Sequence, residues 1–291
     1  MEFFVQQLIL GMSIGGIYAL LAVGYALIFS VFSFTNFAFG GVLMVSAFSG
    51  YFVAKAGLGI PLAFVASILA GIAISIVVEL TAYRPMRRRG ASRLFLMISA
   101  MGITIFIENM ALQMFGANMR RLETGFTVDT ITLGVYKVGK VDILSLVASC
   151  ISLMIIWVYL YKTRSGISIR ACATDTSTAG LMGLKVDRVS LLVFIISGVT
   201  AGIAGLFLGM KYSVRPAMGS TSNKAFISSV IGGLGSLPGA VVGGFILGIL
   251  ETIVSAYISV TFRDLFSYLI MIIVLMFLPN GILGKGTQDK I

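Results

Sequence analysis

The sequence predicts an all-α protein that crosses a membrane several times, and three observations support this fold class. Of the 291 residues, 58% are hydrophobic and 11% charged, with a mean hydropathy of +1.04, whereas soluble proteins are about half apolar and a quarter charged. Charge-free stretches of about 20 residues, the length that crosses a bilayer core, recur along the chain. The 21 Lys and Arg gather between those stretches, so membrane topology accounts for the net charge of +10 better than nucleic-acid binding does.

Eight apolar stretches give the expected membrane spans of a single domain over residues 1–291. In chain order they cover approximately Phe4–Phe32, Phe37–Ala54, Pro61–Leu80, Leu94–Phe115, Ile143–Leu160, Val189–Met210, Gly239–Ile258 and Leu265–Leu278. The first is expected to remain as a span, because Met1 and Glu2 provide no basic region and the apolar run exceeds a signal peptide in length. Cys150 and Cys172 fall in different environments and predict no disulfide.

The charges of the connecting segments predict which side each loop faces. The basic loops 83–93 and 162–188 are separated by two spans and therefore share one side. The positive-inside rule makes that side cytoplasmic, together with the C-terminal tail. The segment 118–142 then lies on the periplasmic or extracellular side, where alternating residues over Thr130–Val138 predict a small hairpin.

Counting crossings predicts a re-entrant element late in the chain. Only two full spans follow Met210, whereas an odd number is needed to reach a cytoplasmic tail. The stretch Lys224–Gly239 can supply the missing element, because its short apolar piece runs into glycines and a proline that end a helix. Non-helical backbone at membrane depth is tolerated only where protein or a water-filled cavity surrounds it.

A weaker break, Phe34–Gly41, interrupts two apolar runs near the start of the chain. Paired broken helices often flank the substrate route in transporters, so residues at both breaks are candidates for the pathway. They are Asn36, Phe37, Phe39 and Gly40 at the first break, and Gly232, Gly233 and Gly235 at the second. The alternative is that the glycines serve the fold alone.

The loop 162–188 is long enough to hold a short helix. Asp175 and its neighbours offer an N-cap, Ser177–Leu181 can follow, and Met182-Gly183 ends the helix. A short helix that exposes small residues suits docking into a groove on another subunit. An ordinary solvated connector is the alternative.

Polar residues inside the spans are costly, so each calls for a hypothesis. Glu108 and Asn109 lie in the fourth stretch and Glu251 in the seventh, where a structural role is favoured. Glu79 is expected to reach the interface beside the basic loop. The chain has no histidine and no phosphate-binding loop of the Gly-x-x-x-x-Gly-Lys-Ser/Thr form, so we expect no catalytic residue, metal or cofactor.

Several motifs, in the same order, resemble permeases of the LIV type, which import branched-chain amino acids with ATP-binding partners. The motifs are Gly15–Gly24, Asn36–Gly40, Arg170–Asp175, Ala179–Gly183, Phe194–Gly198, Ala201–Gly205, Lys224–Phe226, Gly232–Ala240, Leu247–Glu251 and Leu278–Gly284. The resemblance covers nearly the whole chain.

This resemblance implies a type II importer-like permease in a bacterial cytoplasmic (inner) membrane. Its implied partners are a second permease chain, related or identical, two cytoplasmic ATP-binding subunits that hydrolyse ATP, an external binding protein and membrane lipid. The resemblance also implies that the loop 162–188 couples the permease to the ATPase. The coupling residues it suggests are Arg170, Asp175, Ala179 and Gly183.

The chain departs from the family pattern at two places. The coupling pattern Glu-Ala-Ala-x-x-x-Gly keeps only Ala179 and Gly183. Family members usually read Asn-x-Ala-His-Gly followed by an acidic residue, where this chain has Phe39 and Gly41. A different substrate and a structural role for the motif both remain open. Other functions left open are an ion-coupled carrier or channel, which the lack of histidine disfavours, and a permease of the same family for urea, nucleosides or aromatic acids.

Overall fold

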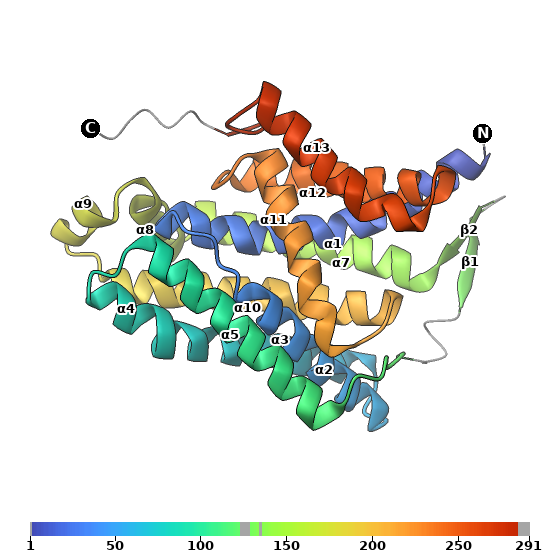
Figure 1. Cartoon of the computed structure of the whole chain (residues 1–291), viewed down its shortest axis with the longest axis horizontal. Coiled ribbons are helices and arrows are strands. Elements are labelled where there is room, and N and C mark those ends of the chain that lie inside the picture. Colours follow the sequence, from blue (N-terminus) through green and yellow to red (C-terminus); the bar gives the residue numbers. More distant parts are fainter. Residues whose placement is uncertain (1, 123–128, 134–135, 285–291) are drawn as a thin grey trace.

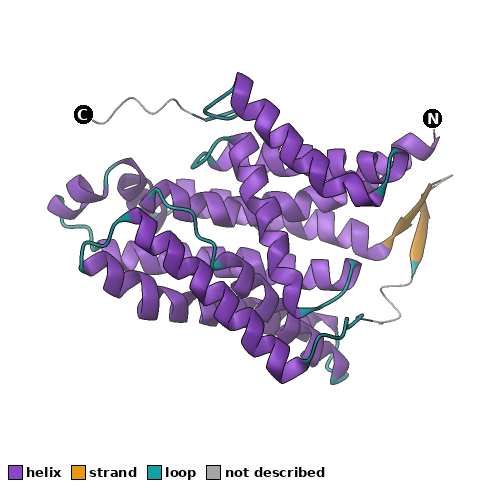
Figure 2. Ribbon diagram, viewed as in Figure 1, coloured by secondary structure: helices purple, strands orange, loops and turns teal. Residues whose placement is uncertain are grey.

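The computed structural model describes residues 2–122, 129–133 and 136–284. Long helices run side by side along the molecule, and one two-stranded hairpin lies at the same end as the N-terminus (Figure 1). Figure 2 shows that helices make up nearly all of the described chain. The all-α membrane fold predicted from the sequence is confirmed.

The elements follow one another in a simple order. They are α1 (Glu2–Phe32), α2 (Phe39–Lys55), α3 (Ile60–Val78), the π-helix η1 (Glu79–Tyr83), α4 (Arg84–Arg88), α5 (Arg93–Phe115), β1 (Thr130–Leu133), β2 (Tyr136–Gly139), α7 (Lys140–Lys162), α8 (Arg164–Thr174), α9 (Thr176–Leu181), α10 (Val186–Lys211), the 3-10 helix η2 (Pro216–Thr221), α11 (Ser222–Gly232), α12 (Leu237–Tyr257), the 3-10 helix η3 (Val260–Phe262) and α13 (Arg263–Phe277).

Each of the eight expected spans coincides, apart from a few residues at its ends, with one continuous helical segment. Among the described residues, seven helical segments are long and apolar enough to cross a membrane, and α2 is a shorter apolar helix of 17 residues. The third segment runs continuously over Ile60–Arg88, further than the apolar pattern predicts, because η1 and α4 continue α3 without a break. Within it, Arg87 turns back towards η1. Arg87 Nη2 lies 2.8 Å from Glu79 Oε1.

Glu79 does not lie at the membrane interface, where the sequence predicts it. Its side chain is fully buried and accepts a 2.6 Å hydrogen bond from Ser190 Oγ of α10, besides its contact with Arg87. Arg87, Arg84 and Arg88 all also contact Asp187 at the start of α10. The buried carboxylate therefore ties η1 and α4 to α10 instead of reaching out to the interface.

Two helices, α1 and α10, form the centre of the bundle, and small residues let their neighbours approach closely. A Cβ atom on Gly248 of α12 would overlap Gly15 of α1, and one on Gly198 of α10 would lie 2.6 Å from the carbonyl oxygen of Gly71 in α3. Backbones in direct contact gain dispersion energy without needing a large side chain between them. These glycines therefore serve the packing of the helices.

The molecule has two distinct ends. The hairpin and the start of α1 lie at one, the hairpin end, and α4, α8 and α9 lie at the other, the α9 end (Figure 1). The two basic loops therefore lie at the same end, as the sequence predicts. Strands β1 and β2 pair antiparallel, with Thr130 opposite Gly139.

Candidate functional site

The first break is a short non-helical segment between α1 and α2, and Asn36 organises it. Asn36 Oδ1 accepts a 3.1 Å hydrogen bond from the Ala38 amide and a 2.6 Å hydrogen bond from the Tyr83 hydroxyl of η1. Asn36 and Phe39 are only 3% and 1% exposed, and the Phe39 ring packs edge-on against Tyr25 of α1. The predicted pathway residues Asn36 and Phe39 thus lie inside the chain's own packing.

The remaining predicted residues of this break face the start of the second half-helix. The Phe37 carbonyl accepts a 2.7 Å hydrogen bond from Thr104 of α5, and its ring lies 6.4 Å from that of Phe226 in α11. A Cβ atom on Gly40 would lie 2.6 Å from the Gly219 carbonyl oxygen and 2.9 Å from Ser222 Oγ. The first turn of α2 therefore sits directly against η2 and the start of α11.

The second break separates α11 from α12, and its glycines are needed for two different reasons. Gly233 and Gly235 adopt φ angles of 113° and 83°, which favour glycine because other residues clash there. Gly232 instead lies so close to Gly239 of α12 that a Cβ atom would overlap its carbonyl oxygen. The expected chain break is confirmed.

Residues after α13 complete this second break. The amides of Ile282 and Leu283 donate hydrogen bonds of 3.0 and 2.9 Å to the carbonyl oxygens of Ile231 and Gly232. Gly281, with φ of 78°, lies against the Gly233 backbone. The C-terminal segment therefore caps α11, whose last carbonyls would otherwise lack partners.

The expected short helix in the loop 162–188 is confirmed as α9, and α8 precedes it. Asp175 caps α9 by accepting a 2.9 Å hydrogen bond from the Ser177 amide. Ala179 is only 6% exposed, Gly183 has φ of 86°, and the Arg170 guanidinium stacks 4.9 Å from the Tyr161 ring. Asp175 and Gly183 therefore shape α9 and the turn after it, whereas Ala179 is too buried to contact a partner subunit directly.

Two further residues, which were not among the predicted coupling residues, dominate the surface of this loop. Leu181 and Met182 are 88% and 82% exposed at the turn after α9, and a pair of large apolar residues inside a polar loop was the signal available. A groove of about 310 Å³ lies beside the start of α9. Its lining residues are Phe32, Arg87, Arg88, Thr176, Ser177, Val186 and Asp187.

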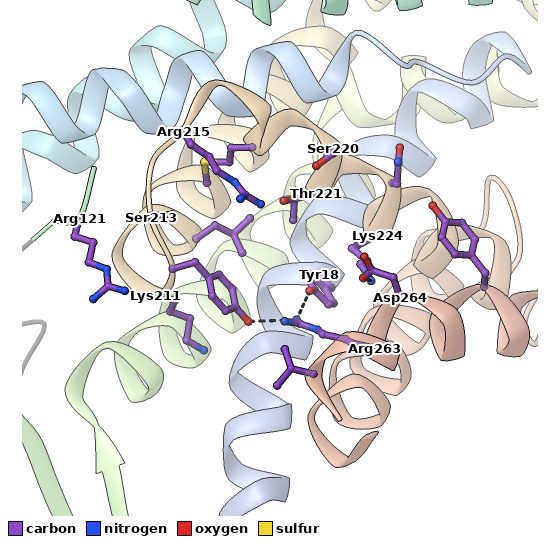
Figure 3. A pocket seen from close by; sticks show the side chains of 16 residues that line it. Tyr18, Arg121, Lys211, Ser213, Arg215, Ser220, Thr221, Lys224, Arg263 and Asp264 are labelled. Atoms are coloured by element: carbon purple, nitrogen blue, oxygen red, sulfur yellow. Dashed lines mark hydrogen bonds and ion pairs between the residues drawn. The ribbon is translucent and has the colours of Figure 1, made fainter. Parts of the chain in front are cut away.

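A larger cavity of about 590 Å³ opens between α10, η2, α11 and α13. Figure 3 shows its basic side chains converging on one space. They are Arg121, Lys211, Arg215, Lys224 and Arg263, and the acidic Asp264 lines the cavity beside them. The sequence pattern does not predict this cavity, because its residues come from segments far apart along the chain.

The buried carboxylate of Glu251 lies next to this cavity and binds several of the side chains that line it. Glu251 accepts hydrogen bonds from Tyr18, at 2.9 Å, and from Ser267, at 2.6 Å. It also forms ion pairs with Lys224 and with Arg263, the latter at 2.6 Å. Arg263 in turn bonds the Tyr18 hydroxyl (Figure 3). Both oxygens are occupied, which supports the structural role expected for Glu251.

Neither cysteine lies in these sites. Cys172 lies on the buried face of α8, and burial raises the pKa of its thiol. Cys150 is exposed on the surface of α7. Within the described residues, no group of three or more His, Cys, Asp or Glu side chains could hold a metal ion.

Comparisons with known proteins find similarity over nearly the whole chain. Residues 7–275 match the family described as "Branched-chain amino acid transport system / permease component". The high-affinity branched-chain amino acid transport system permease protein LivH of Escherichia coli (strain K12) is 33% identical over 310 residues, covering 99% of this chain and 98% of its own length. The corresponding permease protein BraD of Pseudomonas aeruginosa is 32% identical over 303 residues, with the same coverage.

A solved structure shares the fold. It is an ABC transporter assigned to the metal-chelate type, captured in an inward-facing conformation. The TM-score is 0.55 at 17% sequence identity, covering 94% of this chain and 86% of the other.

Proposed function

Because this chain belongs to the permease-component family of branched-chain amino acid transport systems, we propose that it forms the membrane pathway of an ATP-driven importer for branched-chain or related small amino acids. The observation that carries this proposal is the match to LivH over 99% of this chain and 98% of that protein. A likeness over nearly all of both chains includes every span, both breaks and the loop at the α9 end.

The permease is proposed to work with partners rather than alone. Two ATP-binding subunits supply the hydrolysis, since this sequence lacks a phosphate-binding loop. A second permease chain, related or identical, forms the other wall of the route, and an external binding protein delivers the substrate. A bacterial cytoplasmic membrane is the location that fits this assembly.

The ATPase is proposed to dock on the α9 end. The exposed pair Leu181 and Met182 supports this, because large apolar side chains on a polar loop are typical of a contact surface. The neighbouring groove is lined by Arg87, Arg88 and the start of α9, among others. Of the proposed coupling residues, Ala179 is buried beneath this surface, Asp175 caps α9 and Gly183 follows the turn after it. Arg170 is exposed and stacks on Tyr161.

The substrate route is proposed to pass beside the two breaks. The exposed part of Phe37 and the junction of Gly40 with η2 border it at the first break, and Gly232, Gly233 and Gly235 allow α11 to end within the bundle at the second. Asn36 and Phe39 act indirectly, by fixing the shape of the first break.

Uptake by the reconstituted transporter tests the function. Proteoliposomes that hold both permeases, both ATPases and the binding protein are expected to accumulate labelled leucine with ATP inside, and to stop when the ATPase is inactivated. Leucine uptake that continues without ATP hydrolysis would instead indicate a carrier or channel. Uptake of urea, a nucleoside or an aromatic acid in place of leucine would support the ATP-driven mechanism but assign a different substrate.

A further inference from the structure

Among the residues that the structure describes, one acidic side chain inside the membrane-spanning helices has no partner. Glu79, Asp142, Asp187, Glu251 and Asp264 each pair with a Lys or Arg. Glu108 of α5, by contrast, forms no hydrogen bond or ion pair with any described residue. An unpaired carboxylate in a span is costly and marks a functional site by default.

Glu108 lies at the point where the two half-helices meet. It is two helical turns before the end of α5 at Phe115 and therefore about 10 Å inside that end. Its Oε1 atom lies against Gly219 of η2, where a Cβ atom would overlap it. Gly219 also packs against the Gly40 carbonyl group at the start of α2. Ser222, the first residue of α11, packs against Gly40 as well.

The starts of these two helices favour a negative charge at this place. The N-terminus of a helix carries a partial positive charge from unpaired amides, and neither α2 nor α11 begins with a capping side chain. Ser222 is only 8% exposed, and its side chain forms no hydrogen bond with a described residue. These helix starts place partial positive charge near Glu108, but they do not supply the full opposite charge that a Lys or Arg would.

We propose that Glu108 binds the ammonium group of the transported amino acid as it passes the junction of α2, η2 and α11. This inference rests on the proposed function and names one of its substrate contacts. Glu108 is half-buried, and its carboxylate packs against Gly219 of η2. A charge-assisted hydrogen bond to an ammonium group is among the stronger polar contacts that proteins make.

The surroundings of Glu108 suit the rest of such a substrate. Thr104, one turn earlier on α5, holds the Phe37 carbonyl at 2.7 Å, so the Phe37 backbone lies close to Glu108. The rings of Phe37 and Phe226 lie 6.4 Å apart. An aliphatic side chain next to the ammonium group would meet apolar rings rather than charges.

Substitution of Glu108 in the complete transporter tests this contact. Glu108→Gln keeps the shape and removes the charge, and Glu108→Asp keeps the charge on a shorter chain. The matched control is Asn109→Ala on the same helix, since Asn109 is exposed and donates a 2.8 Å hydrogen bond to the Ile105 carbonyl of its own helix. Each complex is purified, reconstituted and assayed for leucine uptake and for ATP hydrolysis stimulated by the loaded binding protein.

Glu108→Gln is expected to lower the kcat/KM of leucine uptake by about 10- to 100-fold, the range for a lost hydrogen bond to a charged group. Stimulated ATP hydrolysis should persist, Glu108→Asp should restore part of the uptake, and Asn109→Ala should match the wild type. Normal uptake by Glu108→Gln would overturn the proposal. If Glu108→Gln fails to assemble, Glu108→Asp decides the question, because its carboxylate is drawn back by one methylene from the ammonium group. Assembly with reduced uptake would support the proposal, and assembly with wild-type uptake would overturn it.

Leucine uptake by the wild-type complex distinguishes a failure of this proposal from a failure of the proposed function. Absence of leucine uptake by the wild type refutes the function. Uptake by the wild type that Glu108→Gln leaves unchanged refutes only the role of Glu108.

Discussion

At the scale of single residues, buried charges are the strongest constraints on this bundle. Glu251 is fully buried, yet it bonds groups from α1, α11 and α13. Removing one member of a buried ion pair leaves the other charge without a partner, at a cost of about 3–5 kcal/mol. The half-helix α11 therefore depends on Glu251 for its position, through Lys224.

Glu251→Ala is expected to lower the free energy of unfolding by about 3–5 kcal/mol, since Lys224 and Arg263 would both lose their buried partner. Asp264→Asn is the matched control, because the Asp264 side chain is 72% exposed and also contacts Lys224. It should cost about 1 kcal/mol or less. Equilibrium unfolding of the purified chain in mixed micelles measures both, and equal effects would contradict the central role of Glu251.

Asn36→Leu is expected to destabilise the chain by about 1–3 kcal/mol, because the Ala38 amide and the Tyr83 hydroxyl both lose their acceptor in a buried site. Tyr83→Phe removes only the second of these bonds and should cost less, about 1 kcal/mol. The same unfolding measurement compares the two. A larger loss from Tyr83→Phe would show that Asn36 is not the organiser of the first break.

At the scale of elements, the apolar pattern predicts each span because an uncharged run of membrane length rarely occurs outside a membrane helix. The breaks and α9 are also predictable, since glycine, proline and an Asp cap act locally. The cap at the end of α11 is not predictable from the sequence, because the amides that form it belong to Ile282 and Leu283, about 50 residues further along the chain. The basic cavity escapes prediction for the same reason.

The turn after α9 allows a direct test of coupling. Leu181→Ser combined with Met182→Ser is expected to weaken co-purification with the ATPase and to lower uptake about tenfold or more, because apolar contact area is lost from the interface. Met119→Ser, at a residue 66% exposed near the hairpin end, is the control. Normal uptake by the double variant would place the ATPase contact elsewhere.

At the scale of the whole molecule, the two ends differ in charge and in the elements they carry, which predicts how the chain lies in the membrane. The hairpin end should face outward and the α9 end inward, because the two basic loops belong to the α9 end. Charge alone suggests this orientation, and an accessibility measurement can test it.

Single cysteines at the two ends provide that measurement. In a background without Cys150 and Cys172, a membrane-impermeant maleimide is expected to label Met119→Cys in intact cells and Met182→Cys only after lysis. The exposed fractions of the native residues, 66% and 82%, favour rapid labelling at both sites once the reagent reaches them. The reverse pattern would invert the orientation of the chain. Native Cys172 itself should label slowly, because burial raises the pKa of its thiol and leaves little thiolate.

The cap that residues after α13 place on α11 has a consequence for biosynthesis. A ribosome makes α11 well before Ile282 and Leu283, and α12 and α13 must enter the membrane in between. Until then the Ile231 and Gly232 carbonyls at the end of α11 lack these two hydrogen-bond donors. The segment that borders the proposed route is thus among the last parts of the permease to mature, and a ribosome stalled just after α13 would leave it unfinished.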